Sequence, residues 1–350
     1  MHITIIDRSN GKLILFLPAL NALQQLGLPV YVQSAQKDTA EQLERLAEQI
    51  GVRENLPENR VDIVLADTPE AIFSRDSSSL IVYPLISETD ATSFEQMREK
   101  QTRIVPLSGE RLLGHALGDV RSLTDFVRKD MSEPILKGKR ILISAGPTAE
   151  DLDPVRYLTN RSSGKMGVAL ARAAFILGAE IHLVFGPGQA EIPAHISVDR
   201  VRSARQMAQA VFNRFDWCDV YIGAAAVADF TPAGVATEKI KKSKGTYRLP
   251  LKRTIDILET LGQQRTRQIL VGFSVETQNP VENSLKKLQR KRLDLMIVNN
   301  PKEKGAAFAV DTNKVMLIEK DGKVHDWPLM SKWDLSFKIM QFIAGMTNHE

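Results

Sequence analysis

Short apolar runs alternate with amphipathic stretches along the first third of the chain. The apolar runs have the length and β-branched content of short strands, and they fall at residues 3–6, 29–33, 61–66, 79–83 and 102–106. Between and after them, the spacing of apolar positions predicts helices over residues 13–26, 39–50 and 111–127. Alternation of this kind indicates a parallel sheet covered by helices.

The same alternation returns, more strongly, after a break near residues 130–138, which contain Pro and Gly and lack apolar periodicity. Apolar runs predict strands at residues 140–144, 180–185, 219–225, 269–273 and 293–299. Helices are expected over residues 164–177, 203–215, 283–292 and 331–346, the second opening with a capping box at Ser203 and Gln206. Residues 315–319 and 323–327, joined at Asp321 and Gly322, predict a hairpin.

These patterns place the chain in the α/β class. We expect two Rossmann-like or flavodoxin-like parallel-sheet domains, the second with a small C-terminal hairpin. Residues 1–130 form the first, a flavodoxin-like domain of unknown role, residues 131–138 a linker, and residues 139–350 the second.

Bulk composition is that of a water-soluble globular protein, with 350 residues, 43% hydrophobic and 25% charged. A lone cysteine, Cys218, and a start without signal-peptide features predict a cytoplasmic protein that makes no contact with a membrane. The net charge is +4, and basic side chains cluster at residues 239–244 and 286–292. Such clusters suit the phosphates of a small ligand as well as nucleic acid, and they are also common on solvated surfaces.

An unusually long connection follows the strand at residues 140–144. It ends at Ser162, Ser163 and Gly164, where the start of a helix could bind an anion; a tight turn with a hydroxyl cap explains the pattern equally well. Two features exclude a P-loop at Gly164 and Lys165: the upstream glycine spacing is wrong, and Met166 stands where a P-loop has the Ser or Thr that binds magnesium.

Small side chains from Gly223 to Ala228 end a later strand, with Asp229 just beyond it. They would let a base or a phosphate approach the backbone, although tight packing of a helix on the sheet is the alternative. Phe273, at another strand end, could stack a base or belong to the core.

Together, these segments resemble the signature of phosphopantothenoylcysteine synthetases, in that family's order and at similar spacing over residues 138–346. The matching segments are Ala-Gly-Pro-Thr at 145–148, Leu-Asp-Pro-Val-Arg-Tyr at 152–157, Asn160, Ser-Ser-Gly-Lys-Met-Gly at 162–167, Ala-Ala-Ala-Val-Ala-Asp at 224–229, Glu-Lys-Ile-Lys-Lys at 238–242, Val-Gly-Phe at 271–273, Glu-Thr at 276–277, and Leu-Asp at 293–294 before Asn299.

The resemblance implies a ligase that joins 4′-phosphopantothenate to cysteine. In bacterial members of the family, CTP activates the phosphopantothenate carboxylate as an acyl-cytidylate, pyrophosphate leaves, and the amine of cysteine then displaces CMP. Mg²⁺ offsets the charge of the triphosphate. Members are homodimers, and loops at the dimer interface help to complete the phosphopantothenate site.

Roles for individual residues follow from the same resemblance. Asn160 would recognise the acyl-nucleotide, Arg156 lies on the same loop, and Lys239 would bind the triphosphate and stabilise the departing pyrophosphate. Phe273 would line the cytosine pocket. The remaining nucleotide contacts are expected from Gly223, Ala224, Ala225, Asp229, Lys287 and Lys291.

The chain departs from the family at one place in the nucleotide site. Thr254, Ile255, Asp256 and Ile257 stand where the family commonly reads Asn-Pro-Asp-Ile, so the choice between CTP and ATP stays open. No residues are assigned to Mg²⁺.

Three other functions are weighed against the ligase. A bifunctional flavoprotein would also decarboxylate the product, but FMN is not expected because residues 1–130 lack the Pro-Ala-Ser-Ala-Asn-Thr-like stretch and the lid cysteine of such decarboxylases. A basic nucleic-acid-binding protein is disfavoured by the 6% aromatic content and the lack of a nucleic-acid motif. A Rossmann oxidoreductase would need the missing glycine fingerprint.

Overall fold

The computed structural model describes residues 117–347, except 242–247, 277 and 300–309. Before residue 117 it describes six strands and two further residues, Leu23 and Gln25. The chain forms two compact units, which are described separately below. The first contains Met1–Glu133 with Pro193–His195, and the second contains Pro134–Ile192 with Ile196–Glu350.

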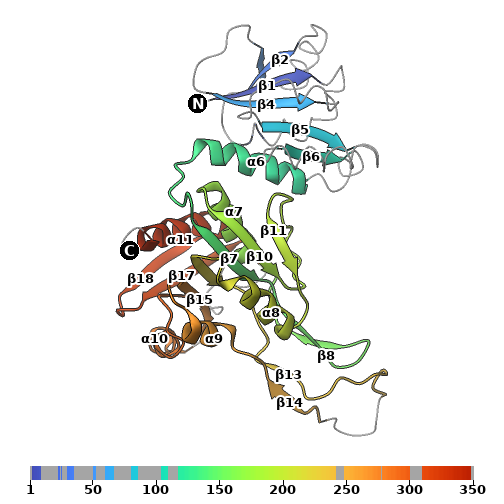
Figure 1. Cartoon of the computed structure of the whole chain (residues 1–350), viewed down its shortest axis with the longest axis vertical. Coiled ribbons are helices and arrows are strands. Elements are labelled where there is room, and N and C mark those ends of the chain that lie inside the picture. The colour runs from blue at the N-terminus through green and yellow to red at the C-terminus, as the bar shows by residue number, and fades with distance from the viewer. Residues whose placement is uncertain are drawn as a thin grey trace. The chain divides into compact units, whose positions relative to one another are not determined.

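The first unit contains a six-stranded sheet in the order β3-β2-β1-β4-β5-β6, parallel throughout (Figure 1). Its strands are β1 (His2–Arg8), β2 (Val30–Ser34), β3 (Ile50–Val52), β4 (Arg60–Ala66), β5 (Leu80–Leu85) and β6 (Ile104–Ser108), and helix α6 (Leu117–Met131) follows them. The order is that of a Rossmann sheet, in which the chain reverses direction next to β1. Strand β3 begins at Ile50, the last residue of the expected helix 39–50, and the rest of that helix lies outside the described residues. The expected helix 13–26 also lies outside them, except for Leu23 and Gln25.

The second unit contains an eight-stranded sheet in the order β11-β10-β7-β12-β15-β16-β17-β18. Its strands are β7 (Arg140–Ala145), β10 (Glu180–Phe185), β11 (Ser197–Arg200), β12 (Val220–Gly223), β15 (Ile269–Val275), β16 (Leu295–Asn299), β17 (Thr312–Glu319) and β18 (Val324–Ser331). Neighbours are parallel from β11 to β16, and β17 and β18 add an antiparallel hairpin. The expected mostly parallel α/β fold with a C-terminal hairpin is therefore confirmed for this unit.

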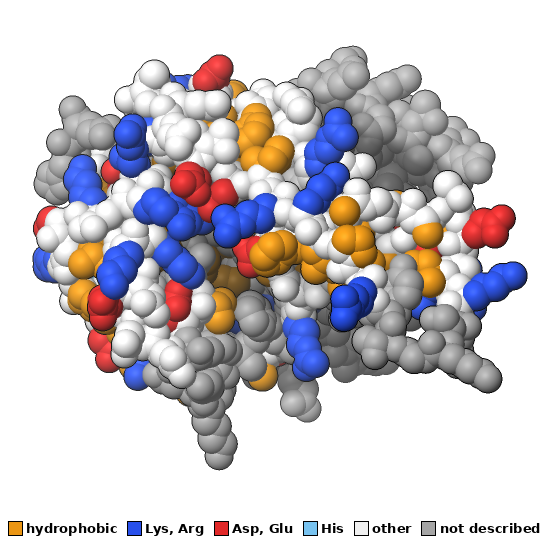
Figure 2. Space-filling view, turned by 90° about the horizontal axis from the view of Figure 1, so that it is seen from below, with side chains coloured by type: hydrophobic (Ala, Val, Ile, Leu, Met, Phe, Trp, Pro, Cys, Tyr) orange, Lys and Arg blue, Asp and Glu red, His pale blue; other side chains and the backbone are white. Residues whose placement is uncertain are grey.

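A protrusion that we call the arm extends beyond this sheet. It consists of two short antiparallel pairs, β8 (Ala149–Asp151) with β9 (Tyr157–Thr159), and β13 (Phe230–Pro232) with β14 (Leu251–Arg253) (Figure 1). Figure 2 shows the molecule from the end at which β13 and β14 lie, where hydrophobic side chains form a band with Lys and Arg side chains around it. Strands of three residues are too short to show a period of two, so the sequence predicted a plain connection here.

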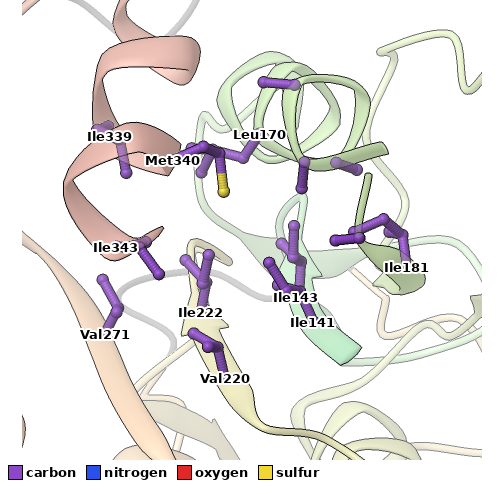
Figure 3. Packing of buried hydrophobic residues seen from close by; sticks show 14 of the residues in the cluster. Ile141, Ile143, Leu170, Ile181, Val220, Ile222, Val271, Ile339, Met340 and Ile343 are labelled. Atoms are coloured by element: carbon purple, nitrogen blue, oxygen red, sulfur yellow. The ribbon is translucent and has the colours of Figure 1, made fainter. Parts of the chain in front are cut away.

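Helices cover both faces of the second sheet. Helices α7 (Lys165–Ile176) and α11 (Lys332–Thr347) share one hydrophobic core, and α8 (Ala204–Phe215), α9 (Ile257–Gln264) and α10 (Pro280–Arg290) share another. Figure 3 shows Ile141, Ile143, Val220 and Ile222 of the sheet pointing at α7 and α11. Strand β7 is buried on both faces, as expected of a central parallel strand.

Local signals also hold where they could be checked. Ser203 accepts from the backbone N–H of Gln206 at 3.2 Å, and the Gln206 side chain accepts from the backbone N–H of Ser203 at 3.1 Å, so the expected capping box opens α8. Gly322 turns the β17–β18 hairpin with a φ of 90°. In the part of the chain that the structure describes, no helix is both long and apolar enough to cross a bilayer.

Candidate active site

A cleft of about 1010 Å³ opens at the carboxyl ends of β7, β12, β15 and β16. Residues from these strand ends, Ser144, Gly223, Phe273 and Asn299, contribute to its lining. The chain runs from β7 outward to β10 and β11, then returns to β12 on the other side of β7. Parallel sheets bind ligands at such a reversal, because the connections on its two sides diverge and leave a crevice.

The first turn of α7 forms one wall of the cleft. Gly164, the N-cap residue, has a φ of 82°, and the backbone N–H groups of Gly164 and Lys165 donate to the hydroxyls of Ser162 at 3.3 Å and Ser163 at 3.5 Å. A Cβ added at Gly167 would lie 2.2 Å from the Cβ of Ala145 at the end of β7. Glycine at position 167 therefore lets α7 begin directly against the strand, so that its first turn reaches the cleft.

Two buried hydroxyls lie deeper in the cleft, on neighbouring strands. The Ser144 Oγ and the Tyr221 Oη are 2.8 Å apart, and both side chains are buried. Burial raises the pKa of Tyr221, so the phenol stays neutral at physiological pH and can donate a hydrogen bond.

The segment with the family departure forms the opposite wall, where α9 begins. Asp256 is the N-cap of α9 and accepts from the backbone N–H of Glu259 at 3.1 Å. Its carboxylate also binds the ammonium of Lys291 at 2.8 Å. Burial works against the charged form, but the hydrogen bond and charge of Lys291, together with the N–H of Glu259 and the charge of Arg290, outweigh it and hold the pKa of Asp256 below its usual value. The hydroxyl of Thr254 donates to the carbonyl of Ala228 at 2.5 Å, so this side chain is bound to the backbone of the strand end.

Helix α10 contributes a second lysine that is bound to an acid. The Lys287 Nζ lies 2.6 Å from the Glu276 Oε1, which also accepts from the hydroxyl of Ser274 at 3.0 Å. Burial opposes ionisation of Glu276, and the hydrogen bonds from Lys287 and Ser274 outweigh it, so the pKa of Glu276 lies below its usual value. Glu276 therefore stays charged beside Lys287.

Positive charge dominates the lining. Three carboxylates, those of Asp229, Asp256 and Glu259, face a larger number of cationic side chains. The cationic side chains are Arg161, Lys165, Arg253, Lys287, Arg290, Lys291 and Lys332. An excess of cations in a partly enclosed cleft favours an anionic ligand such as a nucleotide.

Twelve of the fourteen residues singled out from the sequence line this cleft, including Asn160 and the whole of residues 223–225 and 254–257. The amide of Asn160 donates to the carbonyls of Ala226 at 3.0 Å and Val227 at 3.3 Å. The two exceptions are Arg156 and Lys239, which are exposed on the arm and the segment next to it. They lie near each other, since the Arg156 Nη2 donates to the carbonyl of Ile240 at 2.8 Å.

The family described as "DNA/pantothenate metabolism flavoprotein C-terminal domain" (DFP) matches residues 136–346. That match covers more than half of the chain. The chain belongs to the DFP family.

Individual relatives agree with the DFP assignment. The chain is 48% identical over 213 residues to the coenzyme A biosynthesis bifunctional protein CoaBC of Bacillus subtilis, an alignment that covers 61% of this chain and 52% of the relative. It is 42% identical over 225 residues to a cysteine/cysteine sulfinic acid decarboxylase from an unknown prokaryotic organism, which covers 64% of this chain and 63% of the relative. The chain thus spans between about half and two thirds of the length of these relatives.

A solved structure matches the same DFP region. The crystal structure of the C-terminal domain of a CoaBC protein aligns with a TM-score of 0.54 and 40% sequence identity, and it covers 62% of this chain and 100% of that chain. The DNA/pantothenate metabolism flavoprotein of Streptococcus pneumoniae shares the fold with a TM-score of 0.52 at 21% identity.

Several residues of the cleft in this DFP domain escaped sequence reasoning. The pair formed by Ser144 and Tyr221 was hidden because each residue fits an ordinary buried strand. Asn313 and Lys332 belong to the C-terminal hairpin and to α11, yet both side chains are buried and line the cleft. The feature that marks Lys332 is the burial of a lysine at a helix start, and burial cannot be read from a single sequence.

The described residues contain no group of three or more His, Cys, Asp or Glu side chains that could hold a metal ion by themselves. Among the three acids of the lining, Asp256 is bound to Lys291, and Glu259 lies 3.9 Å from Arg290. Asp229, at the end of the small-residue segment, remains as the acid best placed to share a cation with a phosphate group.

Proposed function

We propose that the second unit is a phosphopantothenate–cysteine ligase of coenzyme A biosynthesis, which uses CTP to activate 4′-phosphopantothenate. One observation carries the proposal: twelve residues that the resemblance assigned to substrates line one cationic cleft at the sheet's reversal point. Membership of the DFP family and 48% identity to a coenzyme A biosynthesis protein support the same role.

The proposed reaction has two steps. A carboxylate oxygen of 4′-phosphopantothenate attacks the α-phosphorus of CTP, and pyrophosphate leaves with the electrons of the broken P–O bond. The amine of cysteine then attacks the acyl carbon, a proton is lost, and CMP leaves as the amide forms. The protein's share is to hold two anions together and to stabilise the charge that develops on the leaving groups.

The cations of the cleft suit these tasks. Lys287 and Lys291 are each oriented by a carboxylate, Glu276 and Asp256, so their ammonium groups are in place before a nucleotide arrives. Phe273 and Gly223 line the same cleft as these lysines, where the resemblance expects the nucleotide. Because the hydroxyl of Thr254 is bound to the backbone, the base contacts there fall to the main chain, and both CTP and ATP belong in the test.

We further propose that Mg²⁺ accompanies the nucleotide. The residues fit this role, because Mg²⁺ commonly takes one or two carboxylates together with phosphate oxygens and water. Asp229 would supply the carboxylate. When bound, the ion would offset the negative charge of the triphosphate.

The arm suits a homodimer, which we propose as the working state. Five large apolar side chains of the arm and its connections are between 44% and 59% exposed: Val155, Tyr157, Phe230, Val235 and Leu251. A second copy of the chain could cover these apolar side chains, and Arg156 and Lys239 could then act on the cleft of that second copy. Sedimentation equilibrium should give twice the chain mass, and Val155→Glu should give monomers; a wild-type monomer at micromolar concentration would refute this part.

The deciding experiment is a pyrophosphate-release assay with 4′-phosphopantothenate, cysteine, Mg²⁺ and either CTP or ATP. The ligase predicts release that requires the nucleotide and 4′-phosphopantothenate, and product that also requires cysteine. Release no faster than the blank with both nucleotides would reject the function. The purified chain should also be colourless, since residues 1–130 lack the decarboxylase sequence features expected of an FMN site.

A further inference from the structure

Asp153 has an unusual set of contacts for a residue outside the cleft. It lies in the connection between β8 and β9, and its side chain is fully removed from solvent. One carboxylate oxygen, Oδ1, accepts from the backbone N–H groups of Val155 and Arg156, both at 2.8 Å. The other, Oδ2, accepts from the Nε of Arg156 at 3.0 Å, from its Nη2 at 2.5 Å, and from the backbone N–H of Ile240 at 3.1 Å.

These donors keep Asp153 charged. The hydrogen bonds from the guanidinium of Arg156 hold the pKa of Asp153 far below its usual range. A buried carboxylate is stable only where donors surround it, and five hydrogen bonds hold the groups around Asp153 against its two oxygens.

The donors come from two segments that are far apart in the sequence. Besides its bond to Asp153 through the N–H, Ile240 accepts from the Nη2 of Arg156 through its carbonyl, at 2.8 Å. A further backbone bond joins the N–H of Ala236 to the carbonyl of Leu152 at 3.0 Å. Lys239 lies between these two attachment points and is itself exposed. The path of the chain on both sides of Lys239 is therefore set by the β8–β9 connection.

We infer that Asp153 is a positioning residue, which makes Arg156 and the segment around Lys239 move as one unit. The inference rests on the proposed function, in which these two cations act on the nucleotide and on the acyl intermediate. Residues 233–235 and 237–239 are exposed, so little packing holds this segment apart from the contacts described above. A lysine on a loosely held segment samples many positions, and a displacement of about 1 Å can lower a rate by roughly a hundredfold.

Asp153→Asn isolates this role. The amide oxygen can still accept from the two backbone N–H groups, which preserves the local turn. The amide NH₂ then faces the guanidinium of Arg156 and the N–H of Ile240, donor against donor, so the bonds of Asp153 to the Arg156 side chain and to the Lys239 segment are lost together. We expect the rate of nucleotide-dependent pyrophosphate release to fall about ten- to hundredfold.

Asp151→Asn is the matched control. Asp151 lies two residues away on the same hairpin and binds Arg202 at 2.6 Å, with both side chains more than 40% exposed. A surface pair of this kind contributes little, and the Asp151 carboxylate forms no hydrogen bond or ion pair with residues 236–240 in the described structure. The control variant should stay within twofold of the wild type in rate.

A double-mutant cycle separates positioning from general damage to the fold. In the background of Lys239→Gln, Asp153→Asn should lower pyrophosphate release by a clearly smaller factor than in the wild type, because Lys239, one of the two cations that Asp153 positions, is already gone. Hydrogen exchange at the Ile240 amide should also accelerate in Asp153→Asn and remain slow in Asp151→Asn.

Each outcome then has one meaning. Equal rates for wild type, Asp153→Asn and Asp151→Asn would overturn the inference and leave the ligase intact. The same would follow if the double variant lost activity by the full product of the losses in Asp153→Asn and in Lys239→Gln. An inactive wild type would reject the proposed function instead. Should Asp153→Asn fail to fold, Arg156→Lys serves in the same cycle, since it keeps the cation and removes the bridge to Ile240.

Discussion

Replacing Gly167 by alanine tests how tightly α7 is held against the sheet, and with it the position of one wall of the cleft. The added Cβ would lie 2.2 Å from the Cβ of Ala145 and 3.3 Å from its Cα. Carbon atoms in contact prefer about 3.5–4.0 Å, so the start of α7 must retreat by more than about 1 Å. Ala145 has no rotamer that relieves the overlap, and its position is fixed by β10 and β12 on either side.

The magnitude follows from two opposing terms. Overpacking of a tight core destabilises a fold by about 1–3 kcal/mol, and the 2.2 Å approach places Gly167→Ala toward the upper end. Alanine regains up to about 1 kcal/mol of helix propensity. The net expectation is a loss of about 1–2 kcal/mol in the free energy of unfolding. Because Gly164 and Lys165 line the cleft from the same turn, the KM for the nucleotide should rise roughly tenfold.

Gly345→Ala is the control, since a Cβ at this position in α11 would have no heavy atom within 4 Å. This variant should gain up to about 1 kcal/mol and keep the wild-type KM. Urea unfolding followed by tryptophan fluorescence reports on the second unit alone, because Trp217, Trp327 and Trp333 are the three tryptophans of the chain. If Gly167→Ala unfolded at the same urea concentration as Gly345→Ala, the close approach of α7 to β7 would be wrong.

Three further outcomes are expected. Glu276→Gln should raise the KM for the nucleotide about three- to tenfold, because it releases Lys287 of α10. Glu282→Gln removes the exposed pair with Lys286 on α10, and in the same assay it should change this KM less than twofold. Burial lowers the pKa of His182, so below pH about 6.5 the unfolded chain binds a proton that the folded chain does not. The free energy of unfolding, measured in urea, should therefore fall between pH 7.5 and pH 5.5, and it should fall less in His182→Gln. An equal fall in the wild type and in His182→Gln would contradict this effect of His182. Burial raises the pKa of Cys218 to about 12, so its thiol should react with an aromatic disulfide reagent far more slowly in the native protein than in urea, and equal rates would show that the site is open.

Much of the second unit follows from local patterns. Strand β10 occupies the six predicted residues, and the ends of α7, α10 and α11 fall within three residues of their predicted positions. These elements carry their own signals, an apolar run for the strand and the helical spacing of apolar positions for the helices, which need no distant partner. The short strands of the arm and the eight-residue helix α9 carry no such signal, because too few residues are available for a period to emerge.

The sequence by itself determined the fold class of the second unit, because fold class depends on the kind and spacing of neighbouring side chains, and its resemblance to a known family named twelve of the residues that line the cleft. Only the tertiary structure decided which of these residues meet. The order of the strands brings Ser144 beside Tyr221 at 2.8 Å, and it leaves Arg156 and Lys239 outside the cleft, joined to each other through Asp153 and Ile240. The pairing of strands β7 and β12 and the contacts of the arm join segments more than 70 residues apart, and no local pattern specifies such contacts.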